Sequence, residues 1–91
     1  MITGDQIRAA RAILGWSAQE AAIRAATTRQ TIQRLEQHAG VPPSRTKTLG
    51  DLQQAFEAAG VEFVGTAEEG PGVRLWSLKR GKGKAKGGSI R

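Results

Sequence analysis

The stretch at residues 17–36, SAQEAAIRAATTRQTIQRLE, constrains the fold most, because it predicts two short helices joined by a tight turn. Ser17 and Glu20 have the spacing of a capping box, in which a hydroxyl and a carboxylate each bond a free amide at a helix start. Thr28 supplies a second N-cap oxygen eleven residues later. Small residues between the two caps allow the helices to approach closely near the turn: Ala22, Ala25 and Ala26.

The second of these helices has one apolar and one polar side. Ile32 and Leu35 are three residues apart and are expected to share the buried side. The polar side carries Arg29, Gln30, Gln33 and Arg34. Arginine donates a fork of hydrogen bonds to guanine and glutamine bonds adenine bidentately in the major groove, which is how a helix-turn-helix docks on DNA. The alternative is a solvated polar face, since both residue types are good helix formers.

Composition limits the class of protein. The 91 residues contain no internal repeat and fit one small domain. The absence of cysteine excludes disulfides, zinc-thiolate sites and thiol redox chemistry. No apolar run is long enough to span a membrane, and the N-terminus lacks the apolar core of a signal peptide. We therefore expect a cytoplasmic protein.

The formal net charge of +6 is unevenly distributed. Residues 1–50 carry seven Lys/Arg and three acids, residues 51–78 carry one Arg and five acids, and residues 79–91 carry six Lys/Arg and no acid. Basic charge thus accompanies the polar helix and the C-terminal tail, which favours binding to a polyanion. The glycine-rich tail at 79–91 is expected to be disordered. It is either an arm that follows phosphates or a solvated terminus.

One helix is predicted before this pair and one after it. Thr3 and Gln6 repeat the capping-box spacing at the start of the first helix, and Gly15 has the place of a helix-ending glycine. After a break at Gly40 and two prolines, Ser44 is expected to cap a fourth helix that continues to about residue 59. Its apolar residues have the spacing of a buried stripe that would close the core: Leu49, Leu52, Phe56 and Ala59.

The periodicity changes to two after residue 60. This predicts strands at 61–64 and 73–78, joined by a loop at 65–72. Alternation would place Val61 and Phe63 on one face of the first strand, with Val73 and Leu75 together on one face of the second. A two-stranded hairpin is marginally stable alone, so it has to pack on the helices or pair with another chain. Edge-strand pairing gives a route to a homodimer; the alternative is that the hairpin only covers the core.

Together these patterns resemble the helix-turn-helix domain of the XRE/Cro-like transcriptional regulators, which has the lambda-repressor-like fold. The resemblance covers residues 3–59 and rests on R-x-x-L-G-W-S at 11–17 combined with T-I-x-R-L-E at 31–36. It implies a mainly α fold, a bundle of about four helices, here followed by a C-terminal β-hairpin. The chain then divides into a DNA-binding domain at 1–60, a hairpin extension at 61–78 and the basic tail at 79–91. The family usually binds a two-fold operator as a dimer.

Carried over position by position, the resemblance implies three base-reading residues: Arg29, Gln30 and Arg34. Thr28 and Gln33 match places near the phosphate backbone or groove edge, and Ser17 is assigned to the same class. Arg45 and Lys47 join this class because they begin the fourth helix, where free amides favour an anion. Arg11 and Glu36 match a structural ion pair between the first and third helices of the family.

Three alanines depart from the family pattern. Ala18 stands where the family often has a glutamine that contacts the phosphate backbone of DNA. Ala21 stands where a larger apolar residue packs, which implies either a thinner local core or compensation by a bulkier neighbour, Trp16 or Ile23. Ala26 stands in the turn where glycine is common, so the turn either avoids positive φ or is strained.

The sequence therefore predicts a sequence-specific transcriptional regulator, with the third helix in the major groove of double-stranded DNA, acting as a homodimer. No cofactor, no membrane partner and no small-molecule effector are expected. The alternative is an antitoxin-like or other protein-interaction module that uses the hairpin and buries Phe63 or Trp76 against its partner. An enzyme is not expected, because one histidine, no cysteine and no clustered carboxylates leave no catalytic constellation.

Overall fold

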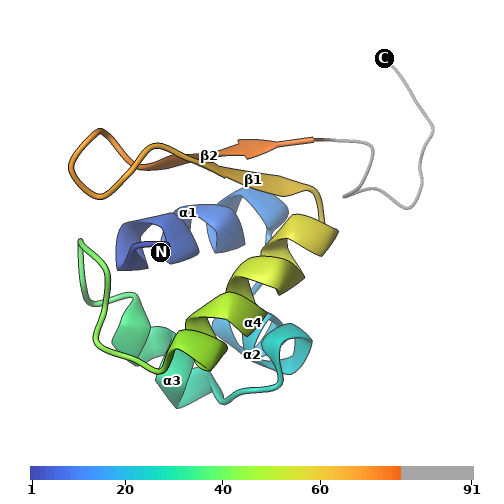
Figure 1. Cartoon of the computed structure of the whole chain (residues 1–91). Helices are drawn as coiled ribbons and strands as arrows, with labels where there is room; N and C mark the ends of the chain where they lie inside the picture. Colours follow the sequence, from blue (N-terminus) through green and yellow to red (C-terminus); the bar gives the residue numbers. More distant parts are fainter. Residues whose placement is uncertain (77–91) are drawn as a thin grey trace, which may run out of the picture.

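The computed structural model describes residues 1–76, which form four helices followed by a two-stranded antiparallel hairpin (Figure 1). The elements are α1 (Gly4–Leu14), α2 (Ala18–Ala25), α3 (Arg29–Leu35), α4 (Thr46–Ala58), β1 (Val61–Val64) and β2 (Gly72–Leu75). The mainly α class and the C-terminal hairpin are as the sequence predicts. The tail at 79–91 and the last two residues of the expected second strand, 77 and 78, lie outside the described residues.

Both ends of α1 follow from its sequence. At the start, the Thr3 hydroxyl accepts the Gln6 N–H, and the Gln6 side-chain oxygen accepts the Thr3 N–H, each at 3.0 Å. This is the complete predicted capping box. At the end, Gly15 adopts the left-handed conformation with φ of 72°, and the next N–H, from Trp16, bonds the Arg11 carbonyl at 2.9 Å.

The start of α2 keeps only half of its predicted capping box. Ser17 Oγ accepts the Glu20 N–H at 3.0 Å. The Glu20 carboxylate does not return to Ser17; it accepts a hydrogen bond from Arg24 Nε at 2.6 Å, one turn further along. A charged donor at this spacing is a stronger partner than a backbone amide. The prediction that the Glu20 carboxylate bonds the Ser17 N–H is therefore wrong.

The turn between α2 and α3 is strained at Ala26. This residue has φ of 57° and ψ of 45°, and it is the only non-glycine residue with positive φ among residues 1–76. The strained alternative is thus the one present, at a cost of roughly 1–2 kcal/mol. Backbone bonds close the turn: Ala26 N–H to the Ile23 carbonyl at 3.3 Å, and Thr27 N–H to the Ala22 carbonyl at 2.9 Å.

Ser44 does not cap α4, which corrects the prediction. The cap position is occupied by Arg45, whose backbone is extended (φ −67°, ψ 141°) and whose side chain makes no cap hydrogen bond. The chain after buried Pro42 stays non-helical through Arg45. Ser44, whose hydroxyl was expected to act as the cap, therefore lies one residue before the N-cap position. The helix then runs to Ala58, close to the predicted end.

The core lies between the helices and under the hairpin. Its largest fully buried side chains come from α1, α3 and α4 and include most of the predicted stripe: Ile7, Ile32, Leu35, Leu49, Leu52 and Phe56. Trp16 packs against this core, with its ring stacked on Phe56 at 5.4 Å between centroids. Ile23 is 63% exposed, so it does not compensate for small Ala21. Of the two residues expected to do so, only Trp16 packs against the core.

The hairpin packs its apolar face on the helices. β1 and β2 pair antiparallel, with Val61 opposite Leu75 and Phe63 opposite Val73, so the predicted faces are correct. Val61 is buried, and the other three are partly buried against the core. The ring of Phe63 meets Phe56 edge-on at 6.0 Å between centroids. Packing on the helices, one of the two expected ways to support the hairpin, is therefore present.

A buried glutamine attaches the hairpin to α1. Gln6 Nε2 donates to the Val64 carbonyl at 3.1 Å and to the Gly72 carbonyl at 2.9 Å. These two residues face each other at the loop end of the hairpin. The same side chain that caps α1 therefore also holds both strands, and no buried side-chain polar atom of the described residues lacks a partner.

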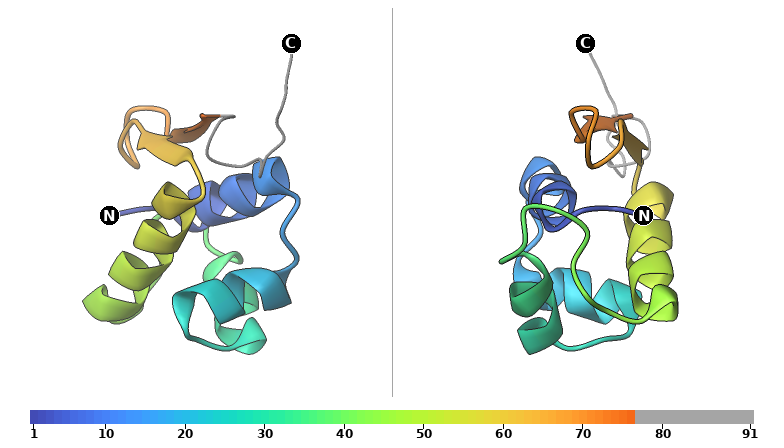
Figure 2. Two further views of the ribbon diagram at one scale, coloured as in Figure 1. Left: turned by 90° about the vertical axis from the view of Figure 1, so that its right-hand side faces the viewer. Right: turned by 60° about the vertical axis from the view of Figure 1, so that its left-hand side comes forward.

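The hairpin and α3 lie at opposite ends of the molecule. In Figure 1 the hairpin lies above α1 and the upper end of α4, and α3 lies at the bottom, beside the lower end of α4. The turned views in Figure 2 keep this arrangement. The 13 residues of α4 span about 20 Å, and this helix connects the two ends.

Candidate nucleic-acid interface

Helix α3 has a buried side and an exposed side, as its sequence predicts. Ile32 and Leu35 are fully buried. At the helix start, the Thr28 hydroxyl oxygen accepts the Thr31 N–H at 3.2 Å, which is the predicted N-cap. The exposed side carries the four polar residues singled out in the sequence: Arg29, Gln30, Gln33 and Arg34.

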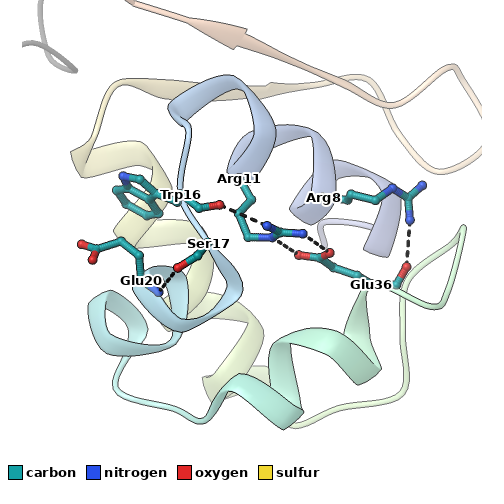
Figure 3. A network of polar contacts seen from close by, with 6 residues as sticks. All are labelled: Arg8, Arg11, Trp16, Ser17, Glu20 and Glu36. Atoms are coloured by element: carbon teal, nitrogen blue, oxygen red, sulfur yellow. Dashed lines mark hydrogen bonds and ion pairs between the residues drawn. The ribbon is translucent and has the colours of Figure 1, made fainter.

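Small residues lie in α2 and in the turn that leads to α3. Ala22 and Ala25 are buried in the core, whereas Ala26 is exposed in the turn. That these alanines let α2 and α3 approach closely stays a prediction. Ser17 begins α2 with its hydroxyl in use as a cap (Figure 3). The α2–turn–α3 unit is thus defined by caps and alanines, and it presents the exposed side of α3 outward.

Ion pairs divide the basic side chains of residues 1–76 into two groups. This range holds eight Lys/Arg and eight Asp/Glu, so its side chains carry no net charge. Five basic side chains are each ion-paired with an acidic one: Arg8, Arg11, Arg24, Lys47 and Arg74. Three have no acidic partner within this range: Arg29, Arg34 and Arg45. The excess of +6 in the whole sequence therefore belongs to the tail.

The three unpaired arginines belong to neighbouring segments. Arg29 and Arg34 stand on α3, and Arg45 is the N-cap residue of α4. Arg34 Nη1 donates to the Pro43 carbonyl at 3.1 Å, which ties the end of α3 to the loop that leads into α4. Unneutralised positive charge therefore gathers at the end of the molecule where α3 lies (Figure 1).

Unpaired acidic charge gathers at the other end. Glu57, Glu68 and Glu69 have no basic partner among residues 1–76. Glu57 is in the last turn of α4, and the two others are in the loop between β1 and β2. The side chains of residues 1–76 thus carry no net charge, but their unpaired charges are separated, with the positive end at α3 and the negative end at the hairpin.

The predicted phosphate-binding residues do not form one set. Arg45 is exposed and unpaired, whereas Lys47 Nζ is bonded to Asp51 at 2.7 Å. Gln33 is exposed on α3 beside the predicted base-reading residues. Ser17 and Thr28 use their hydroxyl oxygens as helix caps. Arg45 is therefore the strongest candidate of this class for a phosphate contact.

Arg11 and Glu36 form the ion pair expected between α1 and the end of α3 (Figure 3). Their side chains are 26% and 10% exposed, respectively. The hydrogen bond to Glu36 raises the pKa of Arg11 above its usual value, against the opposing effect of burial. Arg8 reinforces the junction by donating from Nη1 to the Glu36 backbone carbonyl at 2.9 Å. This junction positions α3 and lies outside its exposed side.

Gln37 is a candidate that sequence reasoning missed. It is exposed, and its N–H bonds the Arg34 carbonyl at 3.3 Å, so it continues the turn just after α3. Positions 30, 33 and 37 recur at helical spacing, which places Gln37 on the same side as Gln30 and Gln33. Extending the helical period past the end of the T-I-x-R-L-E pattern would have found it.

No helix among residues 1–76 is long and apolar enough to cross a membrane. The same residues contain no group of three or more His, Asp or Glu side chains placed to hold a metal ion. Neither protein-family models nor curated protein sequences give a match to this chain. The family resemblance therefore remains a prediction from the residues.

Proposed function

We propose that this chain is a sequence-specific transcriptional regulator of the XRE/Cro-like type that acts on double-stranded DNA in the cytoplasm as a homodimer. Helix α3 enters the major groove, where Arg29, Gln30 and Arg34 read base edges. Arg45 holds a phosphate beside them, with Gln33 and Gln37 at the groove edge.

One observation carries this proposal: the only Lys/Arg side chains without an acidic partner among residues 1–76 are on α3 and at the start of α4. A solvated polar face would gain nothing from leaving its arginines unpaired while arginines elsewhere are paired. A phosphate-bearing partner would neutralise all three at once. The glutamines between them add hydrogen-bonding groups that can distinguish bases.

The test is a selection of bound sequences from random duplex DNA, carried out with the full chain at two salt concentrations. The proposal predicts a recovered motif with two-fold symmetry. A variant carrying Arg29→Ala, Gln30→Ala and Arg34→Ala should lose the motif. The matched control is Arg24→Ala, an exposed and ion-paired arginine of α2, which should keep it.

Two results would overturn the proposal. Binding without any motif, steeply dependent on salt and abolished by truncation before residue 79, would mean that the basic tail alone binds DNA. No binding to DNA at either salt concentration would leave the protein-interaction function, for which exposed Trp76 is the remaining aromatic contact because Phe63 is packed against the core.

A further inference from the structure

Arg34 and Arg11 share a hydrogen bond from the same nitrogen to a backbone carbonyl. Arg11 Nη1 donates to the Trp16 carbonyl at 3.1 Å, and its Nε and Nη2 bond the two carboxylate oxygens of Glu36 (Figure 3). Arg34 Nη1 donates to the Pro43 carbonyl, also at 3.1 Å. Its Nε and Nη2 bond nothing in the part of the chain that the structure describes. Arg34 is thus held as Arg11 is, but its two-donor edge is unoccupied.

The open edge of Arg34 fits a planar group with two acceptors. A guanidinium edge carries two parallel N–H donors, and it can bond a carboxylate, or the O6 and N7 atoms of guanine, in the same bidentate way. The Arg34 side chain is exposed on α3 and has no acidic partner among residues 1–76. The edge that Arg11 uses for Glu36 is therefore open, on Arg34, to a ligand from outside.

The carbonyl that holds Arg34 belongs to a stiff segment. The rings of Pro42 and Pro43 fix the φ of both residues. A residue that precedes a proline is kept extended, which applies to Val41 and Pro42. Pro42 is also buried. The segment is therefore restrained by its own backbone and packing, so it can order the Arg34 guanidinium before any ligand arrives.

We propose that the Pro43 carbonyl positions Arg34 for bidentate hydrogen bonding to O6 and N7 of a guanine in the major groove of duplex DNA. Nε and Nη2 of Arg34 donate to the base, and Nη1 keeps its bond to Pro43. Pro43 is thus a positioning residue, and the loop before α4 contributes to sequence preference through it. This inference rests on the proposed DNA-binding function and adds to it one base and the group that positions its reader.

Arg29 has no such support and provides a comparison within the same helix. It is exposed at the start of α3, and its side chain makes no hydrogen bond or ion pair among residues 1–76. A long side chain that is ordered only on binding loses its rotamer freedom at that moment. Arg34 avoids much of this loss because the Pro43 carbonyl already orders it. Freeing that carbonyl should therefore weaken the contact of Arg34 and leave that of Arg29 unchanged.

The positioning bond can be tested without DNA. The chemical shift of a carbonyl carbon depends on the hydrogen bonds that the carbonyl accepts, so Arg34→Ala should move the Pro43 carbonyl resonance of the full chain. Arg29→Ala, on the same helix, is the matched control and should leave that resonance in place. An unmoved Pro43 resonance in Arg34→Ala would overturn the positioning role.

The contact to guanine is tested on the duplex recovered by selection from random DNA. Each guanine is replaced in turn by 7-deazaguanine, which lacks the N7 acceptor. At the guanine that Arg34 reads, this replacement should weaken binding of the wild-type chain by about tenfold. It should have no further effect on Arg34→Ala, because two changes that remove the same contact are not additive. At every other guanine the two effects should be additive.

The role of Pro43 is tested by Pro43→Gly, which keeps Arg34 but frees the carbonyl. Affinity for the intact duplex should fall by a factor of about 2 to 12, which corresponds to the cost of ordering one long side chain. The fall should be smaller on the duplex with 7-deazaguanine at the Arg34 position. The salt dependence should stay unchanged, because no phosphate contact is lost. The matched control is Val41→Gly, an exposed residue of the same loop, which should keep the wild-type affinities.

Three results would overturn this inference while the proposed function stands. They are a recovered motif without guanine, additive effects of Arg34→Ala and 7-deazaguanine at every position, and equal losses of affinity in Pro43→Gly and Val41→Gly. Absence of binding to any duplex would overturn the proposed function, and the guanine contact with it. The Pro43 carbonyl resonance is measured on the free chain, so the positioning bond is judged independently of that outcome.

Discussion

Arg11 and Glu36 are joined by two hydrogen bonds, from Arg11 Nε to Glu36 Oε2 at 2.7 Å and from Arg11 Nη2 to Glu36 Oε1 at 2.9 Å. A bidentate pair fixes orientation as well as distance. The remaining nitrogen, Nη1, donates to the Trp16 carbonyl at 3.1 Å. One guanidinium therefore holds the end of α1, the link into α2 and the end of α3 together (Figure 3).

Removing the two partners of this pair should have unequal effects. Arg11→Ala leaves the Glu36 carboxylate, 10% exposed, without its partner, so the loss of unfolding free energy should approach the about 3–5 kcal/mol of a broken buried pair. Glu36→Ala should cost less, because Arg11 is more exposed and keeps its bond to Trp16. Urea unfolding measures both. Equal losses, or a loss no larger than that of the exposed-pair control Lys47→Ala, would contradict the prediction.

The arginine of this pair should add no pH dependence near neutrality. The hydrogen bond to Glu36 raises the pKa of Arg11 above its usual value, so its contribution to stability is fully present below its unfolded pKa and is lost only as pH rises through the higher folded value. The difference in unfolding free energy between wild type and Arg11→Lys should therefore be constant from about pH 6 to about pH 9. Urea titrations at both limits test this, and a difference that shrinks towards pH 9 would contradict it.

Replacing Gln6 should loosen the hairpin more than the helices. Gln6→Leu removes the donor to two strand carbonyls and the acceptor for the Thr3 N–H, at a cost of about 1–3 kcal/mol. Amide exchange should accelerate first in β1 and β2. The control is Gln54→Leu on the exposed side of α4, which should change stability by no more than about 0.5 kcal/mol. Uniform acceleration across all elements would argue against a local role.

Gly4→Ala and Gly50→Ala should change stability in opposite directions. A Cβ at Gly4 would collide with the backbone carbonyl oxygens of Leu35 and His38, so α1 would have to move off the end of α3, at a cost of about 1–3 kcal/mol. A Cβ at Gly50 would meet nothing within 4 Å and would raise helix propensity by about 0.5–1 kcal/mol. Thermal unfolding of the two variants checks the signs.

Ala26→Gly should stabilise the turn before α3. Glycine adopts the left-handed conformation of Ala26 without the cost borne by alanine, and the gain is reduced by the greater freedom of glycine in the unfolded chain. A net gain of up to about 1 kcal/mol is expected. Ala25→Gly, one residue earlier and buried in α2, is the control and should destabilise. Loss of stability in Ala26→Gly would show that the turn is not strained.

If the chain binds DNA as proposed, replacing Arg29 and replacing Arg45 should have different effects on DNA affinity and sequence preference. Arg29→Ala should cost about 1–3 kcal/mol on the preferred sequence and relax the preference at one base pair. Arg45→Ala should weaken all sequences alike and lower the salt slope by about 1. Binding isotherms on preferred and scrambled duplexes at several salt concentrations separate the two. Identical behaviour of both variants would reject the division of roles.

Local signals made most of the fold predictable. Thr3, Ser17, Thr28 and Gly15 act within three or four residues of chain, so their roles could be inferred without knowing the tertiary structure. The predictions that failed were those in which a neighbour competed or the chain stayed extended. Glu20 is bonded to Arg24, and Ser44 precedes the cap by one residue.

Long-range relationships could not be read in the same way. The second role of Gln6 depends on strands 58 and 66 residues away, and its spacing to Thr3 predicts only the cap. Residue types likewise do not reveal which arginines form ion pairs. Arg74 pairs with Glu62 on the opposite strand of the hairpin, and Arg11 on α1 pairs with Glu36 at the end of α3. The exposed residues of α3 were therefore predictable as one face of a helix, but the lack of acidic partners for its arginines among residues 1–76 was not.

The separation of unpaired positive and negative charge in residues 1–76 affects how the molecule rotates before it contacts a partner. A body with no net charge feels no net force in a uniform field, yet its separated charges feel a torque in the field of a distant polyanion. With arginines at the α3 end and glutamates about one α4 length away, that torque turns α3 towards negative charge and the hairpin away from it. A polyanion would thus bias the folded body towards presenting α3 during the approach, whatever first brings it close.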